Sequence, residues 1–312
     1  MVNKEKITGI KVVGVGGSGS NAVTRMMKHR IEGVELIAVN TDLQDLKKSN
    51  AHRKIRIGKE VTKGLGTGMN YSLGRKAAQE DEAEIEKFLE DTDLVFIACG
   101  LGGGTGTGAA PVIAAKAKEM GILTVGVVTT PFSFEGKERL RIARKGEELL
   151  KEKVDTLISV SNDKLSAFIE PKTSIDSAFW ICDEVLRQAV SGISDLIMLP
   201  GIINIDFADV RVILKDSGSA IFGIGIASGE NRAKNAALTA LNSPLIDISC
   251  SKAKGVLFNV SGGKDISLIE INEVAKTIRE RVSPDAKIIF GAVQGEDLKK
   301  GEIKVTVIAT GF

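Results

Sequence analysis

The sequence predicts an α/β fold in which a doubly wound parallel sheet is joined by a long central helix to a smaller C-terminal α/β domain. Three observations support this prediction. Short β-branched runs alternate with helical patterns through the first half of the chain, an order of elements that builds a parallel sheet with helices on both faces. Most glycine-rich segments directly follow such a run, as expected where a strand turns into a helix. The length of 312 residues suits about two domains.

The first half begins with a βαβ unit. A strand over residues 10–15 precedes a glycine-rich turn and a helix, and a second strand covers residues 34–39. The helix carries Val23, Met26 and Met27 on one face. The later elements alternate in the same way. Strands are expected over residues 93–98, 123–129 and 156–161, and helices over residues 79–90, 109–120 and 136–151.

The second half opens with a helical segment over residues 173–198, whose apolar positions go most of the way round. We therefore expect it to be buried and to join the two domains. A smaller α/β domain follows, and its second helix opens with Ser267 and Glu270 at the spacing of a capping box. Its strands are expected over residues 220–227, 255–260, 287–291 and 303–310, and its helices over residues 231–241 and 267–282. The predicted parts of the chain are residues 1–172, 173–210 and 211–312.

The composition argues against several classes of protein. Lys and Arg number 42 against 40 Asp and Glu, so the charge balance points to neither nucleic acid nor an acidic partner. Aromatic residues make up only 4%, too few for base-stacking surfaces. The two histidines and three cysteines lack metal-ligand spacing, so we expect no metal ligands from the protein and no histidine-based catalysis. The sequence shows neither a signal peptide nor a run that could insert into a membrane, and the isolated cysteines fit a reducing cytoplasm.

Two glycine-rich motifs indicate the chemistry. The first, GVGGSG at residues 14–19, follows a strand and matches GxGxxG, and Asp42 lies near the end of the next strand at the spacing of a ribose-binding acid. This pattern leaves a nicotinamide-dependent oxidoreductase open as an alternative. The physical mechanism of the motif is less specific, because glycines let backbone N–H groups and a helix N-terminus approach any phosphate.

The second motif, GGGTGTG at residues 102–108, offers another row of backbone donors ahead of another helix, with the hydroxyls of Thr105 and Thr107. An ordinary turn does not need so many glycines, because each costs about 1 kcal/mol in conformational entropy. Two anion-binding loops at the same sheet edge imply a polyphosphate ligand. The pattern GxxxxGK[ST] is absent, which excludes a P-loop NTPase.

The second motif extends to GGGTGTGAAP over residues 102–111, and in this form it resembles the signature of the tubulin superfamily. Further segments resemble its bacterial cell-division family, FtsZ. They lie at residues 39–42, 131–136, 162–164, 185–188, 201–210 and 305–312. The resemblance covers nearly the whole chain. It implies a Rossmann-like GTPase domain, a central helix and a C-terminal domain, assembling head to tail into protofilaments of the division ring in the cytoplasm.

By position, the resemblance implies a site for GTP or GDP, with Mg²⁺ bound through the phosphates. The phosphates would be held by Gly16, Gly17, Ser18, Gly19, Ser20, Asn21, Gly103, Gly104, Thr105, Gly106 and Thr107. Glu135 and Arg139 would contact the ribose and phosphate side. The base would be read by Asn162, Phe179 and Asp183.

The chemistry of the base-reading residues independently supports guanine. Guanine presents N1–H and N2–H donors, which the acceptor-only carboxylate of Asp183 can receive together, whereas adenine has no such pair. Phe179 lies four residues before Asp183, so a helix places the ring and the carboxylate on one face. Without the resemblance, a core phenylalanine and a solvated acid would be the simpler interpretation.

A polar loop supplies the predicted catalytic residues Asn204, Asp206 and Asp209. If the helix over residues 173–198 begins beside the nucleotide, its length puts this loop roughly 40 Å away, too far from the molecule's own terminal phosphate. The loop could instead reach the nucleotide of a neighbour stacked head to tail, where its side chains would orient the attacking water. Hydrolysis would then require assembly. The simpler alternative is an acidic turn that caps the following helix.

Departures from the family pattern affect what the resemblance implies. Met69 and Tyr71 stand where relatives usually have Gly and Pro, in a loop that would face the terminal phosphate and the next subunit. A GTP-binding filament scaffold with little turnover therefore stays open. Ser18 and Ser20 replace commoner glycines and add hydroxyls. The sequence ends at Phe312 without the linker and peptide by which relatives bind membrane-tethering division proteins, so we expect either a shortened chain or another means of tethering.

Overall fold

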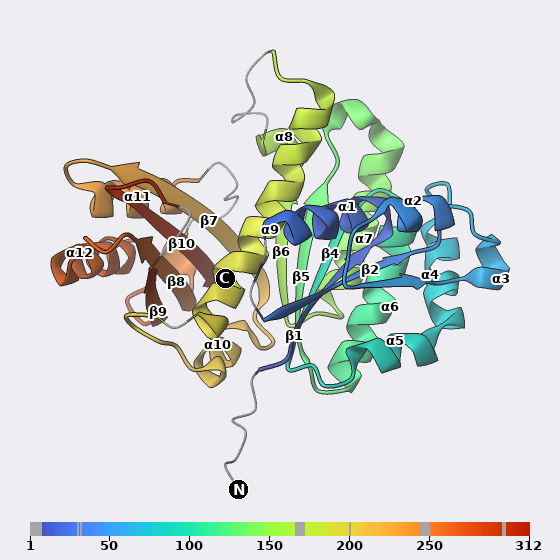
Figure 1. The fold of residues 1–312 in the computed structure, drawn as a ribbon, viewed down its shortest axis with the longest axis horizontal. Helices are drawn as coiled ribbons and strands as arrows, with labels where there is room; N and C mark the ends of the chain where they lie inside the picture. Colours follow the sequence, from blue (N-terminus) through green and yellow to red (C-terminus); the bar gives the residue numbers. More distant parts are fainter. Residues whose placement is uncertain are drawn as a thin grey trace, which may run out of the picture.

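The computed structural model describes residues 8–29, 31, 33–165, 172–199, 201–243, 250–294 and 298–312. In this part of the chain the strands form one sheet, in the order β3-β2-β1-β4-β5-β6-β7-β10-β8-β9 (Figure 1). The strands of the first half are β1 (Ile10–Val15), β2 (Val34–Asn40), β3 (Arg53–Arg56), β4 (Leu94–Gly100), β5 (Leu123–Thr130) and β6 (Thr156–Ser161). Those of the second half are β7 (Gly218–Ser228), β8 (Gly255–Gly262), β9 (Lys287–Gln294) and β10 (Glu302–Thr310).

The helices alternate with these strands. Those of the first half are α1 (Gly16–Met26), α2 (Leu43–Lys48), α3 (Lys59–Thr62), α4 (Tyr71–Glu80), α5 (Glu82–Leu89), α6 (Thr105–Glu119), α7 (Lys137–Lys151) and α8 (Asn162–Leu165). Those that follow are α9 (Ile175–Met198), α10 (Phe207–Leu214), α11 (Arg232–Leu241) and α12 (Leu268–Arg279). Short 3-10 turns cover Met27–His29, Ser133–Glu135 and Cys250–Lys252. The sequence does not predict the short elements α2, α3, α8 and β3, because each is too brief to show a period. It predicts one helix over residues 79–90, where the structure has the two helices α4 and α5.

The first half is the predicted doubly wound parallel sheet. β1 pairs in parallel with β2 and β4, and the parallel order continues through β5 and β6. α1 and α9 pack on one face around Phe96, while α5 and α6 pack on the other around Phe88 and Ile113. Burial on both faces explains why these strands are apolar at nearly every position. Because β1 and β4 are neighbours, the glycine motifs that follow them meet at one edge of the sheet.

Part of each glycine motif lies in the first turns of a helix, which differs from the sequence prediction. α1 begins at Gly16 and α6 at Thr105, whereas the sequence predicts a glycine turn through residue 21 and a helix start at residue 109. Glycine lowers helix stability by about 1 kcal/mol, but its small size permits contacts that offset this loss. A Cβ on Gly19 would lie 2.5 Å from the carbonyl O of Ala98, so only glycine lets α1 lie this close to β4.

The second half continues the same sheet. β7 pairs in parallel with β6, and β10 pairs antiparallel with both β7 and β8. α11 and α12 pack on one face of these strands around Phe258. The predicted capping box is confirmed, because the N–H of Glu270 donates to Ser267 Oγ at 3.3 Å and the N–H of Ser267 donates to Glu270 Oε2 at 2.9 Å. The sequence predicts a loop through residue 209, whereas α10 already begins at Phe207.

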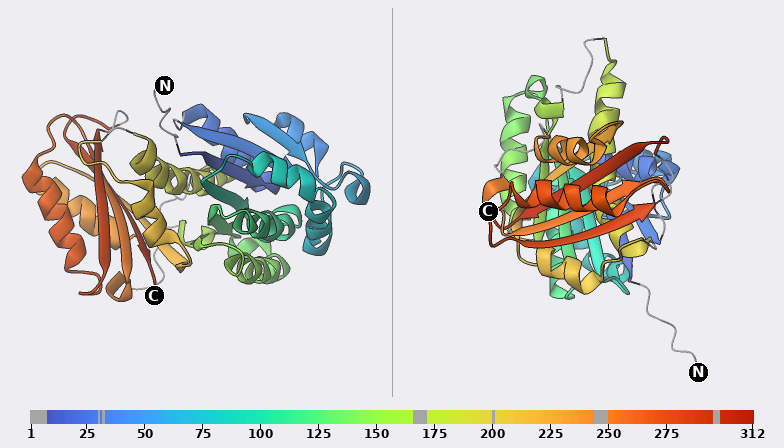
Figure 2. Two further views of the ribbon diagram at one scale, coloured as in Figure 1. Left: turned by 90° about the horizontal axis from the view of Figure 1, so that it is seen from below. Right: turned by 90° about the vertical axis from the view of Figure 1, so that its left-hand side faces the viewer.

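α9 lies between the two halves of the molecule. In Figure 1 it runs from α8 at the top to α10 at the bottom, and the left view of Figure 2 shows it between the first-half helices and the C-terminal strands. The predicted burial is confirmed for its middle turns, where Leu186 and Val190 are fully buried. Near its start, Phe179 and Trp180 are 38% and 46% exposed. Its 24 residues separate the two ends of the molecule by about 36 Å.

Candidate functional site

A cavity of about 630 Å³ opens at the sheet edge where β1 and β4 end. α1, α6, the start of α9 and the loops that follow β4 and β5 contribute its walls. The structure therefore brings both glycine motifs and the predicted base-reading residues to one place. The predicted residues that line the cavity are Gly17, Ser18, Asn21, Gly103, Gly104, Thr105, Gly106, Glu135, Arg139, Asn162, Phe179 and Asp183.

The first turns of α1 and α6 line this cavity, and neither helix has a side-chain cap at its N-terminus. The first N–H groups of a helix lack intrahelical partners, and the aligned peptide dipoles add positive potential at that end. Glycine allows the two helix starts to meet, because a Cβ on Gly16, whose φ is +74°, would lie 2.8 Å from the backbone N of Gly106. Two uncapped helix starts at one cavity form an anion site.

Four of the predicted phosphate residues lie behind the cavity wall. Thr107 is fully buried, and its Oγ1 accepts the N–H of Gly102 at 3.0 Å, so this hydroxyl holds the shape of the motif. Ser20 is buried in α1, where Gly19 packs against β4. Gly16 makes the close approach to Gly106 described above. These residues support the surface that the other motif residues present.

The end of the cavity away from the glycine motifs is built around Asp183. Arg25 Nε donates to Asp183 Oδ2 at 2.7 Å. Burial raises the pKa of the Asp183 carboxyl to about 6, and the Arg25 guanidinium only partly opposes this rise. Nearby in the lining, the buried Asn162 Oδ1 has no hydrogen-bond partner among the described residues. Because an unpaired buried acceptor destabilises the structure, this end of the cavity favours a ligand that donates hydrogen bonds.

Phe179 supplies an aromatic ring one helical turn before Asp183. The ring meets Phe132 edge to face, with centroids 5.7 Å apart and an interplanar angle of 82°, and its 38% exposure leaves area for a planar ligand group. α1 gives the scale of the site. From Gly17 to Arg25 the helix rises about 12 Å, so the anion site and the Asp183 end are separated by a distance that one nucleotide spans.

Glu135 and Arg139 form part of the cavity rim. Arg139 Nη1 lies 2.9 Å from Glu135 Oε2, and the N–H of Phe132 donates to Glu135 Oε1 at 2.9 Å. The backbone bond holds the carboxylate, and the carboxylate in turn holds the guanidinium beside the cavity. A positive group at this position adds to the anion site made by the two helix starts.

Sequence reasoning missed several lining residues. They are Val15, Arg25, Thr67, Gly68, Gly100, Leu101, Thr129, Pro131, Asp176 and Cys182. A helical pattern could have found Arg25, because it lies four residues after Asn21 and so on the same face of α1. The resemblance places the loop before α4 near the phosphates but does not single out Thr67, whose position at the cavity is seen only in the folded structure.

The predicted catalytic residues lie at the other end of α9, and the structure does not bring them to the cavity of the same molecule. Asp206 is the N-cap of α10, and its Oδ1 accepts the N–H of Ala208 at 3.0 Å. Asn204 Oδ1 accepts the N–H of Gly201 at 2.7 Å. Asp209 lies exposed in the first turn of α10. The capping role is thus present for Asp206, and the exposed Asp209 has none.

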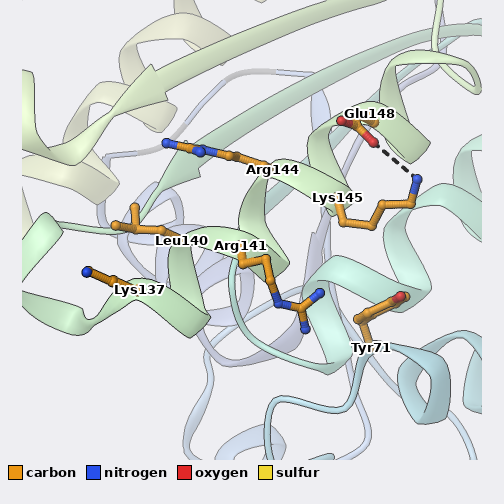
Figure 3. Close-up of a pocket in the computed structure, with 7 residues that line it drawn as sticks. All are labelled: Tyr71, Lys137, Leu140, Arg141, Arg144, Lys145 and Glu148. Carbon is orange, nitrogen blue, oxygen red and sulfur yellow. Dashed lines mark hydrogen bonds and ion pairs between the residues drawn. The ribbon is translucent and has the colours of Figure 1, made fainter.

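A second hollow, of about 650 Å³, lies along the outer face of α7 (Figure 3). Its lining consists of exposed α7 side chains together with Tyr71, and Arg141 extends toward Tyr71 in the view shown. Its charges are partly paired along the helix, since Arg141 donates to Glu138 at 2.6 and 2.8 Å and Lys145 donates to Glu148 at 3.1 Å. This hollow is a solvated charged helix face, so the cavity at the sheet edge is the candidate site.

Over the ranges that the structure describes, no group of three or more His, Cys, Asp or Glu side chains is placed to hold a metal ion. In the same ranges, no helix is long and apolar enough to cross a membrane.

Comparison with known proteins gives the same assignment for both halves of the chain. The model of the Tubulin/FtsZ family, GTPase domain, matches residues 9–170, and that of the FtsZ family, C-terminal domain, matches residues 218–312. A solved FtsZ dimer from M. jannaschii, described as empty, is 46% identical, with a TM-score of 0.93, over 97% of this chain and 88% of that one.

Two more distant structures share the fold alone. CetZ1 from Haloferax volcanii, a GDP-bound monomer, is 21% identical, with a TM-score of 0.82, over 97% of this chain and 94% of that one. CetZ2 from the same organism, a GTPγS-bound protofilament, is 21% identical, with a TM-score of 0.81, over 96% and 92%. The family models and the FtsZ structure show that this chain, with its parallel sheet and its two helix starts at one cavity, belongs to the Tubulin/FtsZ family of GTPases.

Proposed function

We propose that the chain binds GTP in the sheet-edge cavity, assembles head to tail into protofilaments and hydrolyses GTP at the junction between subunits. The observation that carries this proposal is the position of the two sites. The cavity lies at the start of α9 and the acidic turn lies at its end, about 36 Å away. Two complementary sites at opposite ends of one molecule fit a heterologous contact, which generates open filaments. In this proposal residues 1–172 bind GTP, residues 173–210 form the central helix and the catalytic turn, and residues 211–312 form the C-terminal α/β domain.

The phosphates lie, in this proposal, at the uncapped starts of α1 and α6. Gly17, Ser18 and Asn21 line this end from α1, and Gly104 and Gly106 line it from α6. The glycines have no side chains to cover the backbone, so its N–H groups can donate directly to phosphoryl oxygens. Glu135 and Arg139 take the ribose and phosphate side. The remaining motif residues, Gly16, Gly19, Ser20, Gly103, Thr105 and Thr107, complete or support this surface.

Guanine is the base that the other end favours. Asp183 and Asn162 Oδ1 are both acceptors, and guanine offers the N1–H and N2–H donors that satisfy them. Adenine would leave an acceptor unpaired, so the site discriminates against it. Arg25 holds the Asp183 carboxylate in place, and the ring of Phe179 stacks on the base.

Asp206, Asp209 and Asn204 act, in this proposal, on the nucleotide of the neighbouring subunit. The exposed Asp209 orients or deprotonates the attacking water, while Asp206 and Asn204 hold the turn that presents it. Mg²⁺ would be held mainly through the phosphate oxygens. When bound there, Mg²⁺ neutralises charge on the phosphoryl oxygens.

Mixing two inactive variants tests the shared site. Asp209→Asn keeps a nucleotide cavity but lacks the acid, and Asp183→Ala keeps the acid but loses guanine binding. Each alone is expected to release phosphate at least about tenfold more slowly than wild type. In an equimolar mixture, junctions form only at the intact cavities of Asp209→Asn, and about half of these should receive the intact Asp209 of an Asp183→Ala subunit, so phosphate release should rise well above that of either variant alone.

The exposed acid Asp285 provides the matched control. Asp285→Asn should leave phosphate release unchanged. If the mixture stays as inactive as its components while both variants fold, the acid does not act across a subunit junction. Failure of the wild-type chain to bind GTP would reject the proposal as a whole.

In the cell, we propose a role as the division-ring filament at midcell, in contact with division proteins and membrane tethers. The alternative is a filament scaffold with little turnover. One observation favours it: Met69, in the loop beside the phosphate end, has φ +66°, a conformation that suits the glycine of relatives better. Light scattering with a phosphate-release assay separates the two, because a scaffold assembles with GTP without releasing phosphate.

A further inference from the structure

Two segments of the first half carry opposite charges. Residues 47–63 contain seven Lys or Arg and one Glu, and residues 80–91 contain seven Asp or Glu and one Lys. Seven charges less one leave a net charge of +6 in the first segment and −6 in the second. The two values cancel, so the small net charge of the whole chain hides this separation.

The basic segment forms one continuous surface, which we call the basic edge. Lys54 Nζ donates to the carbonyl of Lys47 at 3.2 Å, which joins β3 to α2. Arg56 Nη2 donates to the carbonyl of Lys59 at 3.4 Å, which joins β3 to α3. In the described sheet β3 pairs only with β2, and lysine on such an edge strand opposes pairing with a further strand. A partner would therefore meet side chains here rather than backbone. The exposed lysines of the basic edge are Lys47, Lys48, Lys54, Lys59 and Lys63.

The acidic segment lies beside the basic edge. The N–H of Gly58 donates to Asp81 Oδ2 at 2.7 Å, which joins the start of α3 to the turn before α5. Glu82, Glu86 and Glu90 follow one another at intervals of four residues along α5 and its C-cap, so these exposed acids share one side, which we call the acidic face. α5 packs with β2 and β3 in one apolar cluster, so both charged surfaces belong to the same end of the sheet, at the right of Figure 1.

These charges have no partners of opposite sign in the described part of the molecule. The ion pairs found there include none of the five lysines of the basic edge and none of the three glutamates of the acidic face. Both sets of side chains are therefore available to another molecule.

We propose that this end of the sheet is a side-by-side contact between two copies of the chain, in which the basic edge of each copy meets the acidic face of the other. Because both surfaces lie at the same end, a two-fold rotation brings them together and makes the contact twice. A uniformly anionic partner, such as a nucleic acid or a membrane surface, would be repelled by the acidic face. A second copy presents both signs and matches both surfaces.

Filament assembly strengthens this contact, and in this respect the inference rests on the proposed function. An exposed ion pair contributes at most about 1 kcal/mol, so two free subunits should associate only weakly. Two protofilaments that lie side by side repeat the contact at every subunit, and these small contributions add along their length. The contact should therefore pair filaments rather than single subunits.

Charge reversal in the full chain tests the contact. One variant changes Lys48, Lys54 and Lys59 to Glu, with one residue from each of α2, β3 and α3, and a second changes Glu82, Glu86 and Glu90 to Lys. Each change brings the net charge of its segment to zero. With GTP at about 0.1 M salt, electron microscopy should show paired filaments for wild type and at least about fivefold fewer pairs for either variant. Wild-type pairs should separate toward about 1 M salt, where the screening length falls to about 3 Å.

Mixing the two variants provides the rescue. Each variant keeps the surface that the other has lost, so filaments assembled separately and then mixed should regain part of the pairing. The matched control changes three exposed lysines of the C-terminal half to Glu and should leave pairing unchanged. These lysines are Lys234, Lys252 and Lys264. If a reversed variant fails to fold or to assemble, substitution of the same three residues by Gln takes its place and should reduce pairing in the same direction.

The outcomes separate this inference from the proposed function. Loss of pairing in both variants, with recovery in the mixture, supports the contact. Unchanged or increased pairing in the lysine variant overturns it, because the lysines would then serve only to block strand pairing. Loss of pairing in the lysine variant alone also overturns it, since the acidic face would then have no part. Wild-type filaments that stay single at every salt concentration reject the contact and leave the proposed function standing, whereas a wild type that forms no filaments with GTP rejects the proposed function itself.

Discussion

At the residue scale, Asp183 links burial to recognition. Its carboxyl is 7% exposed and accepts Arg25 Nε at 2.7 Å, yet burial still raises its pKa to about 6. Only the ionised carboxylate accepts hydrogen bonds at both oxygens, so the proposed recognition of guanine requires the form that burial disfavours. The Arg25 ion pair keeps this form accessible near neutral pH.

We expect guanine nucleotide affinity and protein stability to respond to pH in opposite directions. Below about pH 6, the Asp183 carboxyl takes up a proton and becomes a hydrogen-bond donor at one oxygen. Because this O–H group then faces the N–H donors of guanine, the affinity for guanine nucleotides should fall. The folded-state pKa lies above the ordinary value of 3.8, so the folded chain binds this proton more tightly than the unfolded chain does. Through this group, the free energy of unfolding without nucleotide should rise as the pH falls from 6 to 4.

The measurements are nucleotide titrations from pH 5 to 8 and urea unfolding over the lower range. Asp183→Asn provides the comparison, because it should bind weakly at every pH. A wild-type affinity that stays constant down to pH 5 would contradict the assignment of Asp183 to the base.

Met69 offers a second residue-scale prediction. Its φ of +66° costs about 1 kcal/mol for a residue with a side chain, so Met69→Gly should relieve local strain. The gain in the free energy of unfolding should be at most about 1 kcal/mol, because glycine also makes the unfolded chain more flexible. Urea unfolding measures it. Lys63→Gly is the matched control, because Lys63 has φ +52° and lies outside the cavity lining. It should relieve similar strain and leave phosphate release unchanged.

At the element scale, glycines let α4 and α6 pack closely. A Cβ on Gly74 would collide with the carbonyl of Gly104, and one on Gly108 would collide with the carbonyl of Tyr71. These contacts place the loop before α4, with Thr67, against the start of α6. Close packing of two helices thus positions part of the wall of the sheet-edge cavity.

Gly108→Ala separates helix propensity from packing. Propensity alone predicts a gain of about 1 kcal/mol, because alanine is the better helix former. The collision with Tyr71 predicts instead a loss of about 2 kcal/mol and weaker nucleotide binding, since backbone atoms cannot move aside easily. Thermal and urea unfolding decide between them. Gly66→Ala should be nearly neutral, because a Cβ there meets only Asp42 Oδ2, at 3.6 Å.

At the scale of the whole molecule, the proposed function follows from having two different ends. The cavity and the α10 turn lie at opposite ends of α9. The strands on both sides of α9 belong to one continuous sheet, which fixes the positions of these two sites relative to each other. Neither end suffices for the proposed reaction. The filament junction is therefore the unit that hydrolyses GTP in this proposal.

A subunit with one defective end should stop growth. Asp183→Ala keeps the α10 end and can add to a GTP-filled neighbour, but its own cavity cannot recruit the next subunit. Adding about a tenth of this variant to wild type should reduce light scattering by clearly more than a tenth, because each capped filament stops growing. The same amount of Asp285→Asn should leave scattering unchanged. A reduction merely proportional to the amount added would argue against head-to-tail growth.

Much of this architecture could be predicted from local patterns. The strands at residues 10–15 and 156–161 agree residue for residue with β1 and β6, because apolar runs bounded by turns are local signals. The starts of α1 and α6 could not be predicted, since glycine disfavours helix until packing against the sheet offsets its cost. The resemblance placed the main motifs, whereas the contact of Arg25 with Asp183 and that of Thr67 with Thr105 needed the fold.

By itself, the sequence determined the order of strands and helices, the two glycine motifs at one sheet edge and the acidic turn a helix length away. These features depend on neighbours in the chain, so periodicity and residue type reveal them. Only the tertiary structure decided that Thr107 faces inward, that Arg25 meets Asp183 and that Thr41, Thr67 and Thr105 join their hydroxyls. The contacts of Arg25 and of the three threonines link segments distant in the chain, and side-chain packing determines which atoms meet.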